Sequence, residues 1–355
     1  MVVSLPAIIV SLLGLALAGA VGGLYAYSRL SVRRTEARFP PTGKFVTVEG
    51  VRLHYVIEGS GRPVVLLHGA GTSLLDFSMT MLGQAATEFQ VIAFDRPGHG
   101  FSGQPDREVA TPQVQARLLR GALRELGIAT PVLVAHSWGG AVALAYAIDY
   151  PDDVSGIVLL GTVAYAEGYP PAPRIMRVPA IPVIGGILTS VFLVVVGRAA
   201  ARSMFEDAFR PNSIAAVAPE FVEASTALSL RPSQFSANAT QVRHTRSSLI
   251  QMEPQYGKIS VPVVIVTGEA DPHAQPRLHS YPLHEAIPHS QLVVLPETGH
   301  MIPHTRPDAV IQAVRAIWDQ VQAGKRDVIV QPGRPDRTRG LGDRCLGGRG
   351  PDRGA

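Results

Sequence analysis

Short, continuously apolar segments recur through the middle of the chain, and amphipathic stretches separate them. Segments of this length without polar alternation are typical of strands buried on both faces, as in a parallel sheet covered by helices. The segment 44–57 instead has two short runs on either side of Glu49 and Gly50, which predicts an antiparallel hairpin. The predicted buried strands are 63–68, 91–95, 132–135, 157–160, 261–267 and 292–295.

Helices are predicted between these strands. Thr111 is suited to an N-cap and Pro112 to a first helical turn, so a helix begins here and ends at Gly127. Further helices are predicted over 138–150 and 307–318. Because strands and helices alternate along the chain, we expect an α/β protein with a doubly wound, mostly parallel sheet.

The alternation stops between residues 162 and 258. Roughly 95 residues separate two predicted strands here, where a connection of about 2–6 residues is usual. The segment is rich in proline and has helical character. We interpret residues 163–258 as a helical cap inserted over the carboxyl edge of the sheet.

An uncharged run over residues 178–197 lies inside this cap and raises the alternative of a membrane span. Pro179 and Pro182 fit poorly in a spanning helix. A crossing would also put Ser137 and the residues after 260 on opposite sides of the membrane, so the run cannot span if these residues form one site. We interpret the run as a hydrophobic lid helix, with contact to a bilayer surface as an open alternative.

Residues 1–28 contain no charged side chain, and the run 5–24 is long enough to cross a hydrocarbon core of about 30 Å as a helix. Tyr25 and Tyr27 follow, as in an interfacial aromatic belt, and the first basic side chains come after them. Because basic residues flank only the C-terminal end, the positive-inside rule predicts a single-pass membrane anchor with the body in the cytoplasm.

The competing interpretation is a cleaved signal peptide, with residues 18–20 (Ala-Gly-Ala) as the cleavage site. The body would then be secreted or periplasmic. The run lacks the charged segment that begins a signal peptide, which favours the anchor. We therefore expect an anchor over 1–28, a linker over 29–42 and a folded domain over 43–322.

The composition agrees with a large folded domain, because 46% of the residues are apolar and 17% are charged. The single cysteine, Cys345, excludes a disulfide framework and a cysteine-based zinc site. Residues 325–355 carry eight basic and four acidic side chains, which accounts for the whole net charge of +4. Since the rest of the chain is neutral, no nucleic-acid partner is expected, and residues 323–355 are predicted to be a disordered basic tail.

Candidate chemistry begins at residues 135–140 (AHSWGG), which join an apolar strand to a helix. A serine on such a sharp turn presents its hydroxyl to the crevice above the sheet, and the turn requires small residues such as Ala135 and Gly139 two positions on either side. Ser137 is therefore the candidate nucleophile, with a helix N-cap as its competing role. The backbone N–H of Trp138, at the helix N-terminus, is suited to stabilise an oxyanion.

Two further turns follow predicted strands. Residues 68–71 (HGAG) can place a second N–H, that of Ala70, beside the same oxyanion. His68 is expected to be a structural hydrogen-bonding residue rather than a catalyst. In residues 95–100 (DRPGHG), Asp95 is expected to organise loops.

Asp271 and His300 each follow a predicted strand, after the serine along the chain. A serine hydroxyl needs an imidazole base, and the imidazole needs a carboxylate that holds its tautomer. The order Ser, Asp, His, with each residue at the end of a strand, therefore predicts a catalytic triad. Glu269 is the alternative acid. The alternative bases are His273, His289 and His304.

Together these motifs resemble the α/β-hydrolase family over about residues 43–322. The residues that match the family in order and spacing are 68–71, 95–100, 135–140, the Asp271 loop and the Gly-His pair at 299–300. The resemblance implies Ser137 as nucleophile, His300 as base and Asp271 as acid. It implies an oxyanion hole formed by the N–H groups of Ala70 and Trp138. A serine at position 137 argues against the dehalogenase and epoxide-hydrolase branches, which carry aspartate there.

We therefore expect a serine hydrolase that cleaves an ester or related acyl bond of a hydrophobic small molecule. Two alternatives stay open. The same triad could cleave a C–C or amide bond or transfer an acyl group, or the chain could be a non-catalytic, membrane-tethered binding protein. No cofactor or metal is expected, because the histidines are scattered without an HExxH pattern or a carboxylate cluster.

Overall fold

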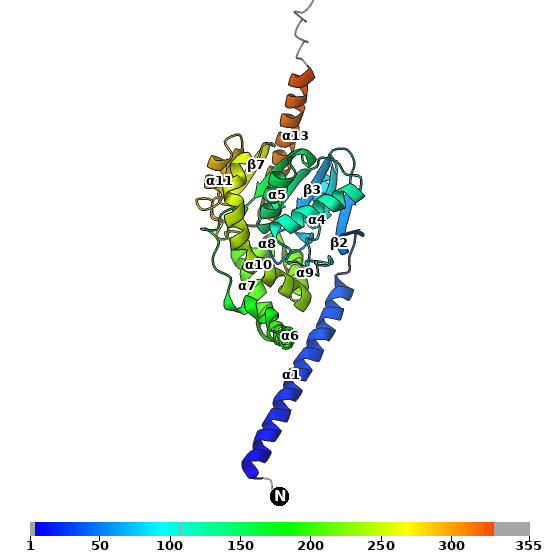
Figure 1. Cartoon of the computed structure of the whole chain (residues 1–355), viewed down its shortest axis with the longest axis vertical. Coiled ribbons are helices and arrows are strands. Elements are labelled where there is room, and N and C mark those ends of the chain that lie inside the picture. Colours follow the sequence, from blue (N-terminus) through cyan, green and yellow to red (C-terminus); the bar gives the residue numbers. More distant parts are fainter. Residues whose placement is uncertain (1–3, 107, 330–355) are drawn as a thin grey trace, which may run out of the picture.

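The computed structural model describes residues 4–106 and 108–329. Its centre is one eight-stranded sheet with the strand order β1-β2-β4-β3-β5-β6-β7-β8 (Figure 1). β1 and β2 form the predicted hairpin, β2 pairs antiparallel with β4, and all pairs from β4 to β8 are parallel. The strands are β1 (Lys44–Val48), β2 (Val51–Glu58), β3 (Pro63–Leu67), β4 (Gln90–Phe94), β5 (Val132–His136), β6 (Gly156–Leu160), β7 (Val263–Gly268) and β8 (Gln291–Leu295).

Helices cover both faces of the sheet and form an apolar core with each. One core joins the sheet to α4 (Pro112–Glu125), α5 (Trp138–Asp149) and α11 (Ser280–Ala286). The other joins it to α2 (Leu75–Ser78), α3 (Leu82–Ala85), α12 (Ile302–Thr305) and α13 (Pro307–Ile329). A short 3-10 helix, η1 (Pro151–Asp153), follows α5. This layered arrangement confirms the predicted fold class.

Strand burial follows position in the sheet. β5, β6 and β7 are buried at every residue, because each has a strand on both sides and helices on both faces. The prediction of a fully buried strand is wrong for β8, where Val293 and Val294 are 37% and 40% exposed. β8 lies at the sheet edge with β7 as its one neighbour, a position that an apolar run does not reveal.

The interval between β6 and β7 forms the helical cap. α6, η3 and α7 run as one continuous helix over residues 185–209. In Figure 1 this helix and its neighbours lie on the side of the body from which α1 emerges. The cap elements are η2 (Arg174–Ala180), α6 (Gly185–Phe192), the π-helical η3 (Leu193–Gly197), α7 (Arg198–Phe209), α8 (Ile214–Val217), α9 (Pro219–Ser229), α10 (Pro232–Met252) and η4 (Glu253–Lys258).

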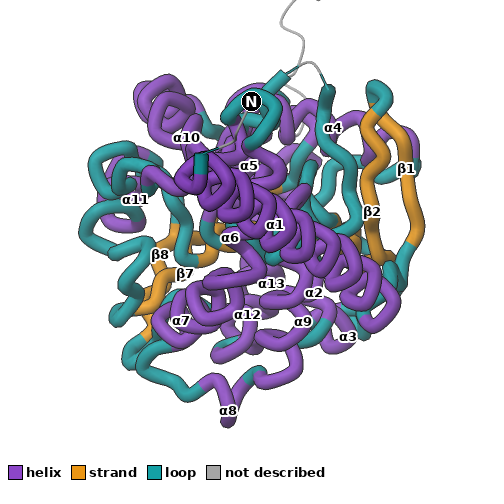
Figure 2. The backbone as a smooth tube through the Cα atoms, turned by 90° about the horizontal axis from the view of Figure 1, so that it is seen from below, coloured by secondary structure: helices purple, strands orange, loops and turns teal. Residues whose placement is uncertain are grey.

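The N-terminal segment forms one long helix, α1 (Leu5–Arg38). The prediction of a linker over 29–42 is therefore wrong for residues 29–38, which continue the helix through the basic segment. Two ion pairs join this part of α1 to the cap, from Glu36 to Arg231 at 3.0 Å and from Arg38 to Glu223 at 2.7 Å. Seen from below (Figure 2), α1 runs across the cap helices that it contacts.

At the other end of the chain, α13 continues to Ile329 and leaves the body on the side opposite α1 (Figure 1). Residues 323–329 are therefore helical, and the predicted start of the disordered tail at 323 is wrong. The rest of that prediction, residues 330–355, lies outside the described residues. Among the described helices, Leu5–Arg38 and Gly185–Phe209 are long and apolar enough to cross a membrane by length and composition.

Candidate active site

Ser137 lies on the turn between β5 and α5, where the sequence predicts a nucleophile. Its backbone has φ of 53° and ψ of −119°, a conformation that non-glycine residues rarely adopt. Such outliers are retained where the surrounding structure enforces them, and they cluster at active sites. The Ser137 N–H donates to the carbonyl oxygen of Leu160 on the next strand at 2.8 Å, which fixes the turn against the sheet.

The requirement for a small residue after the serine has a specific cause. A Cβ added to Gly139 would lie 2.6 Å from the carbonyl oxygens of both Leu67 and His68. These oxygens belong to the end of β3 and the loop that follows it. Glycine at 139 therefore lets the first turn of α5 pack directly on the loop that carries Ala70.

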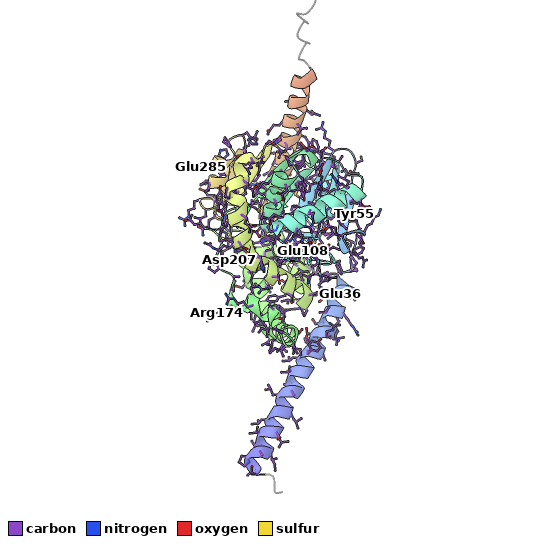
Figure 3. All side chains as sticks on the ribbon, viewed as in Figure 1. Glu36, Tyr55, Glu108, Arg174, Asp207 and Glu285 are labelled. Carbon is purple, nitrogen blue, oxygen red and sulfur yellow. The ribbon has the colours of Figure 1, made fainter. Side chains whose placement is uncertain are left out.

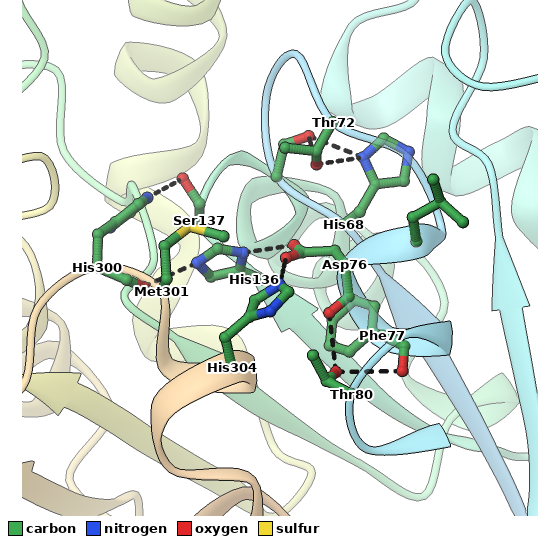
Figure 4. Close-up of polar contacts among 12 residues, drawn as sticks. His68, Thr72, Asp76, Phe77, Thr80, His136, Ser137, His300, Met301 and His304 are labelled. Atoms are coloured by element: carbon green, nitrogen blue, oxygen red, sulfur yellow. Dashed lines mark hydrogen bonds and ion pairs between the residues drawn. The ribbon is translucent and has the colours of Figure 1, made fainter. Parts of the chain in front are cut away.

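The structure brings the three predicted triad side chains together (Figure 4 shows two of them). Nδ1 of His300 donates to Oδ2 of Asp271 at 2.8 Å, and Oγ of Ser137 lies 2.8 Å from Nε2 of the same ring. Because the carboxylate can only accept, the Nδ1 position holds the proton and Nε2 is free to accept from the serine hydroxyl. This is the tautomer that a general base toward Ser137 needs.

Asp271 is itself held by the loop after β7. Its Oδ1 accepts the backbone N–H groups of His273 at 2.8 Å and Ala274 at 2.9 Å. Burial raises the pKa of Asp271, but the charge and hydrogen bond of His300 and the two backbone donors outweigh it, so the pKa lies below its ordinary value. The group is therefore a carboxylate at neutral pH and can stabilise a His300 imidazolium.

The alternative residues are not placed for these roles. Glu269 is exposed, although it lies two residues before Asp271. His289 contacts the carbonyl oxygen of Val261 at 2.9 Å, before the amino end of β7, whereas Asp271 follows the carboxyl end of that strand. The ring centroid of His273 lies 5.2 Å from that of His300. Nε2 of the His273 ring lies 3.5 Å from Oδ2 of Asp207, so this ring borders the site and faces away from the serine hydroxyl's base.

A cavity of about 320 Å³ opens beside the Ser137 hydroxyl. Ala70 and Trp138, the predicted oxyanion residues, both line it. Within the described residues, neither of their backbone amides donates to a backbone carbonyl. The rest of the wall is largely apolar and comes mainly from the cap. The cap residues lining the cavity are Val163, Tyr169, Pro170, Pro171, Ala172, Pro173, Met204, Phe205, Ala208 and Val242.

A second buried network lies directly behind the serine, and sequence reasoning missed it. Nδ1 of His136 lies 2.7 Å from Oδ2 of Asp76, and Nε2 of His304 lies 3.1 Å from Oδ1 of the same carboxylate (Figure 4). Nε2 of His136 contacts the carbonyl oxygen of His300 at 2.9 Å. The one available signal in the sequence was that His136 directly precedes Ser137. Nothing in the sequence around His136 or His304 indicates that Asp76 is their partner.

The charges of this network follow from its contacts. Burial raises the pKa of Asp76, but the charge and hydrogen bonds of His136 and His304 outweigh it and hold the pKa well below its ordinary value. Burial lowers the pKa of His136, but the charge and hydrogen bond of Asp76 and the His300 carbonyl outweigh it and raise the pKa. Both ring nitrogens of His136 face acceptors, so the imidazolium form satisfies every contact.

His68 and Asp95 organise loops, as the sequence predicts. Nε2 of His68 accepts the Arg96 N–H at 3.0 Å, and Nδ1 donates to the Gly69 carbonyl at 2.8 Å. Burial and the nearby Arg96 lower the pKa of His68, in agreement with a neutral ring. Asp95 accepts the backbone N–H of Leu74 and of Phe101, both at 2.8 Å, so one carboxylate joins two loops at the carboxyl edge of the sheet.

Metal chemistry has no evident site in the part of the chain that the structure describes. Within it, no group of three or more His, Cys, Asp or Glu side chains has an arrangement that could hold a metal ion. The histidines near the serine are instead occupied by carboxylate, carbonyl and hydroxyl partners.

Comparison with known proteins identifies the fold that carries this site. A model of the α/β hydrolase fold matches residues 62–307. An uncharacterized protein of Mycobacterium tuberculosis is 29% identical over 301 residues, covering 81% of this chain and 84% of that protein. The enol-lactonase from Burkholderia xenovorans has the same fold, with a TM-score of 0.64 at 21% identity, over 78% of this chain and 100% of that chain. A thermophilic esterase from Thermogutta terrifontis superimposes with a TM-score of 0.63 at 26% identity, over 79% of this chain and 99% of its own.

Proposed function

Since this chain belongs to the α/β hydrolase family, we propose that it is a serine hydrolase that cleaves an ester bond of a hydrophobic small molecule. The observation that carries the proposal is the pair of 2.8 Å contacts that connect Asp271, His300 and Ser137. Contacts of this length provide both a base for the hydroxyl and a carboxylate for the imidazolium that forms. The similarity to an esterase at 26% identity supports the bond type.

The reaction follows from these positions. Nε2 of His300 takes the Ser137 proton as Oγ attacks the acyl carbon, and the resulting imidazolium returns that proton to the leaving alkoxide. Water then attacks the acyl-enzyme with the same imidazole as base, which releases the acid and restores the serine. The N–H groups of Ala70 and Trp138 stabilise the negative oxygen of both tetrahedral intermediates.

The cap supports an apolar acyl group. Met204, Phe205 and Val242 line the cavity together with residues 170–173, and none of these side chains carries a charge or a hydrogen-bonding group suited to one. Burial of each methylene contributes about 0.8 kcal/mol. We therefore expect kcat/KM for p-nitrophenyl esters to rise roughly fourfold for each added methylene until the cavity is filled.

The test combines labelling with turnover. A fluorophosphonate probe should label Ser137 in the folded full-length protein, and the Ser137→Ala variant should lose labelling and lower kcat by a factor on the order of 10⁴–10⁶. The Ser247→Ala variant is a matched control, because that serine is exposed and contacts its own helix backbone. Equal labelling of wild type and Ser137→Ala would contradict the proposal. Turnover of amides or C–C substrates but not of esters would overturn the assigned bond type.

We infer that α1 anchors this hydrolase in a membrane. The helix is long and apolar enough to cross a bilayer, and the 18-residue window that meets this criterion is entirely unburied. Arg29 begins the basic flank, which supports a cytoplasmic body. A topology reporter fused after residue 38 should be active in the cytoplasm, with residues 1–28 retained on mass analysis. A new N-terminus after residue 20 would instead identify a signal peptide.

A further inference from the structure

The cap covers one face of α1, and this coverage begins inside the apolar run. The side chains of α1 that are buried or half-buried include Val21, Leu24, Ser28, Val32 and Thr35. Their spacing of three or four residues places them on one face of the helix. α6 and η3 are among the elements that contact α1. Residues 5–24 as a helix, at about 1.5 Å per residue, are roughly 30 Å long, which matches the hydrocarbon core. If they span that core, Val21 lies within about one helical turn of the edge of the core. The cap therefore reaches the level of the membrane surface.

The part of the cap at this level is apolar, and many of its side chains are exposed. We define residues 181–196 as the cap tip, and none of them is charged. Val183 is 97% exposed, and Val195 is 64% exposed. Contiguous apolar surface of this kind marks an interaction site on a folded protein. The other exposed apolar side chains of the tip are Ile181, Ile184, Ile187, Leu188 and Val196.

Val183 also has an unfavourable backbone conformation. Its φ is 66°, in the left-handed region that favours glycine, asparagine or aspartate and is an outlier for a β-branched residue. A 97% exposed valine gains no burial within the protein that could offset this cost. An almost fully exposed apolar side chain in this conformation is explained if it is buried in another medium.

Basic side chains surround the tip. Exposed Arg174 and Arg177 precede it, and exposed Arg198 follows it (Figure 3 shows Arg174 beside the lower cap). Between Glu167 and Glu206 the chain contains four arginines and no acidic residue. An uncharged apolar surface with a basic rim complements the acyl and headgroup layers of an anionic bilayer.

We propose that the cap tip inserts into the membrane surface beside α1, with anionic phospholipid as its partner. The tip then supplies a second contact with the membrane, in the leaflet that faces the body. Together with α1, this contact fixes the orientation of the body on the membrane. The proposal rests on α1 as an anchor, and it adds an interaction surface that catalysis itself does not require.

The tip also connects to the cavity beside Ser137. Residues 169–173 line that cavity and lead into η2, while Met204 and Phe205 of α7 line it on the other side of the tip. Both arms of the membrane-docked segment therefore form the cavity wall. We infer that an apolar ester dissolved in the bilayer enters the cavity between these two arms.

Docking is tested by measuring membrane depth in the full-length chain. Cys345→Ser removes the native thiol, and single cysteines are placed by Val183→Cys, Leu13→Cys and Ile250→Cys. Each is labelled with an environment-sensitive fluorophore in vesicles of phosphatidylcholine and phosphatidylglycerol containing spin-labelled lipid. Ile250 is the control, because it is 54% exposed on α10 and outside the tip.

The expected result is lipid quenching and a blue shift at positions 183 and 13, but not at 250. Quenching at 13 alone would overturn docking of the tip while leaving the anchor in place. Quenching at neither position would overturn both. This measurement needs no turnover, so its failure is distinct from failure of the proposed hydrolase activity.

Substrate entry from the bilayer is tested with Val183→Asp, a residue type that tolerates the left-handed backbone. The variant should turn over a long-chain ester embedded in vesicles roughly five- to tenfold more slowly, while its kcat/KM for a soluble butyrate ester stays at the wild-type value. Ile250→Asp should leave both rates unchanged. Equal loss on the two substrates, or no loss on the embedded one, would overturn entry through the tip.

Discussion

Nε2 of His136 lies 2.9 Å from the main-chain carbonyl oxygen of His300, so the residue before the nucleophile holds the backbone of the residue that carries the base. Asp76 fixes the other ring nitrogen of His136 at 2.7 Å. The two imidazole rings lie 4.9 Å apart between centroids. His136 contacts neither the serine hydroxyl nor the triad carboxylate through a hydrogen bond, so it acts as a positioning residue for His300.

We expect His136→Gln to lower kcat about ten- to a hundredfold and to change KM less than about twofold. The shorter amide cannot reach both Asp76 and the His300 carbonyl, and a displacement of a catalytic group near 1 Å costs rate on the order of a hundredfold. Binding depends on the cap cavity, which the substitution leaves in place. Steady-state kinetics on a soluble ester measures both constants.

His304→Gln is the matched control, because His304 contacts the same Asp76 carboxylate without touching His300. It should lower stability while keeping kcat within about threefold of wild type. If both variants lose kcat equally, the rate depends on the buried network as a whole, and the specific positioning role of His136 is wrong.

Asp76 and His136 should make stability depend on pH in a defined window. The pKa of Asp76 lies below its usual 3.8, so its contribution is present above that pH and is lost as the pH falls. The pKa of His136 lies above its usual 6.5, so its contribution is present below that pH and is lost as the pH rises through the raised value. The pair therefore stabilises the fold most between about pH 4 and 6.5.

The Asp76→Asn variant tests this window. Removing one partner of a buried ion pair costs about 3–5 kcal/mol, so the unfolding free energy should fall by this amount near pH 5. The difference from wild type should shrink below pH 4 and in alkaline solution. Thermal unfolding in detergent at pH 3, 5 and 9 measures it, and a difference that stays constant across the series would show that the two groups are not an ion pair.

Asp271→Asn should lower kcat by a factor on the order of 10⁴, because the amide no longer holds the tautomer of His300 or stabilises its imidazolium. Glu269→Gln is its control, since that side chain is exposed on the same loop. Its kcat should remain within about twofold of the wild-type value, because substitutions of exposed residues usually have small effects. A large loss in Glu269→Gln with an active Asp271→Asn would reverse the assignment of the acid.

The sheet and the serine turn could be predicted because their signals are local. Each central strand is a continuous apolar run, and residues 135–140 contain the strand end, the small residues and the helix start in one window. Asp271 and His300 follow from the chain order of strand ends. Positions that depend on the rest of the molecule were not predictable, such as the exposed edge strand β8 and the continuation of α1 beyond Arg29. That part of α1 packs on the cap through Glu36 and Arg231, which are 195 positions apart in the sequence.

The network behind the serine illustrates the same limit. Asp76 lies in a four-residue helix, and its histidine partners are 60 and 228 positions away in the sequence. A lone aspartate in a short helix is typical of a solvated position, whereas this one is fully buried. Burial of that charge is favourable only because distant segments bring His136 and His304 to it. No local sequence pattern indicates this pairing.

Gly139 offers a last test, because it connects the serine turn to the loop of Ala70. In Gly139→Ala the new methyl would lie 2.6 Å from two backbone carbonyl oxygens, which cannot rotate away as a side chain would. The loop after β3 must then shift, at a cost of about 1–3 kcal/mol in unfolding free energy. The shift also moves the Ala70 N–H away from the oxyanion, and losing one such donor lowers kcat by about 10²–10³.

Gly257→Ala provides the comparison, since its added Cβ meets the nearest atom, the carbonyl oxygen of Ala286, at an ordinary 3.6 Å. Alanine reduces the freedom of the unfolded chain, so this variant should be unchanged or more stable by up to about 1 kcal/mol, with wild-type kcat. Thermal unfolding and ester kinetics on the two variants separate close packing at the turn from a general effect of replacing glycine. If Gly139→Ala retains wild-type kcat, the Ala70 N–H does not stabilise the transition state, and the oxyanion hole must be formed by other donors beside Trp138.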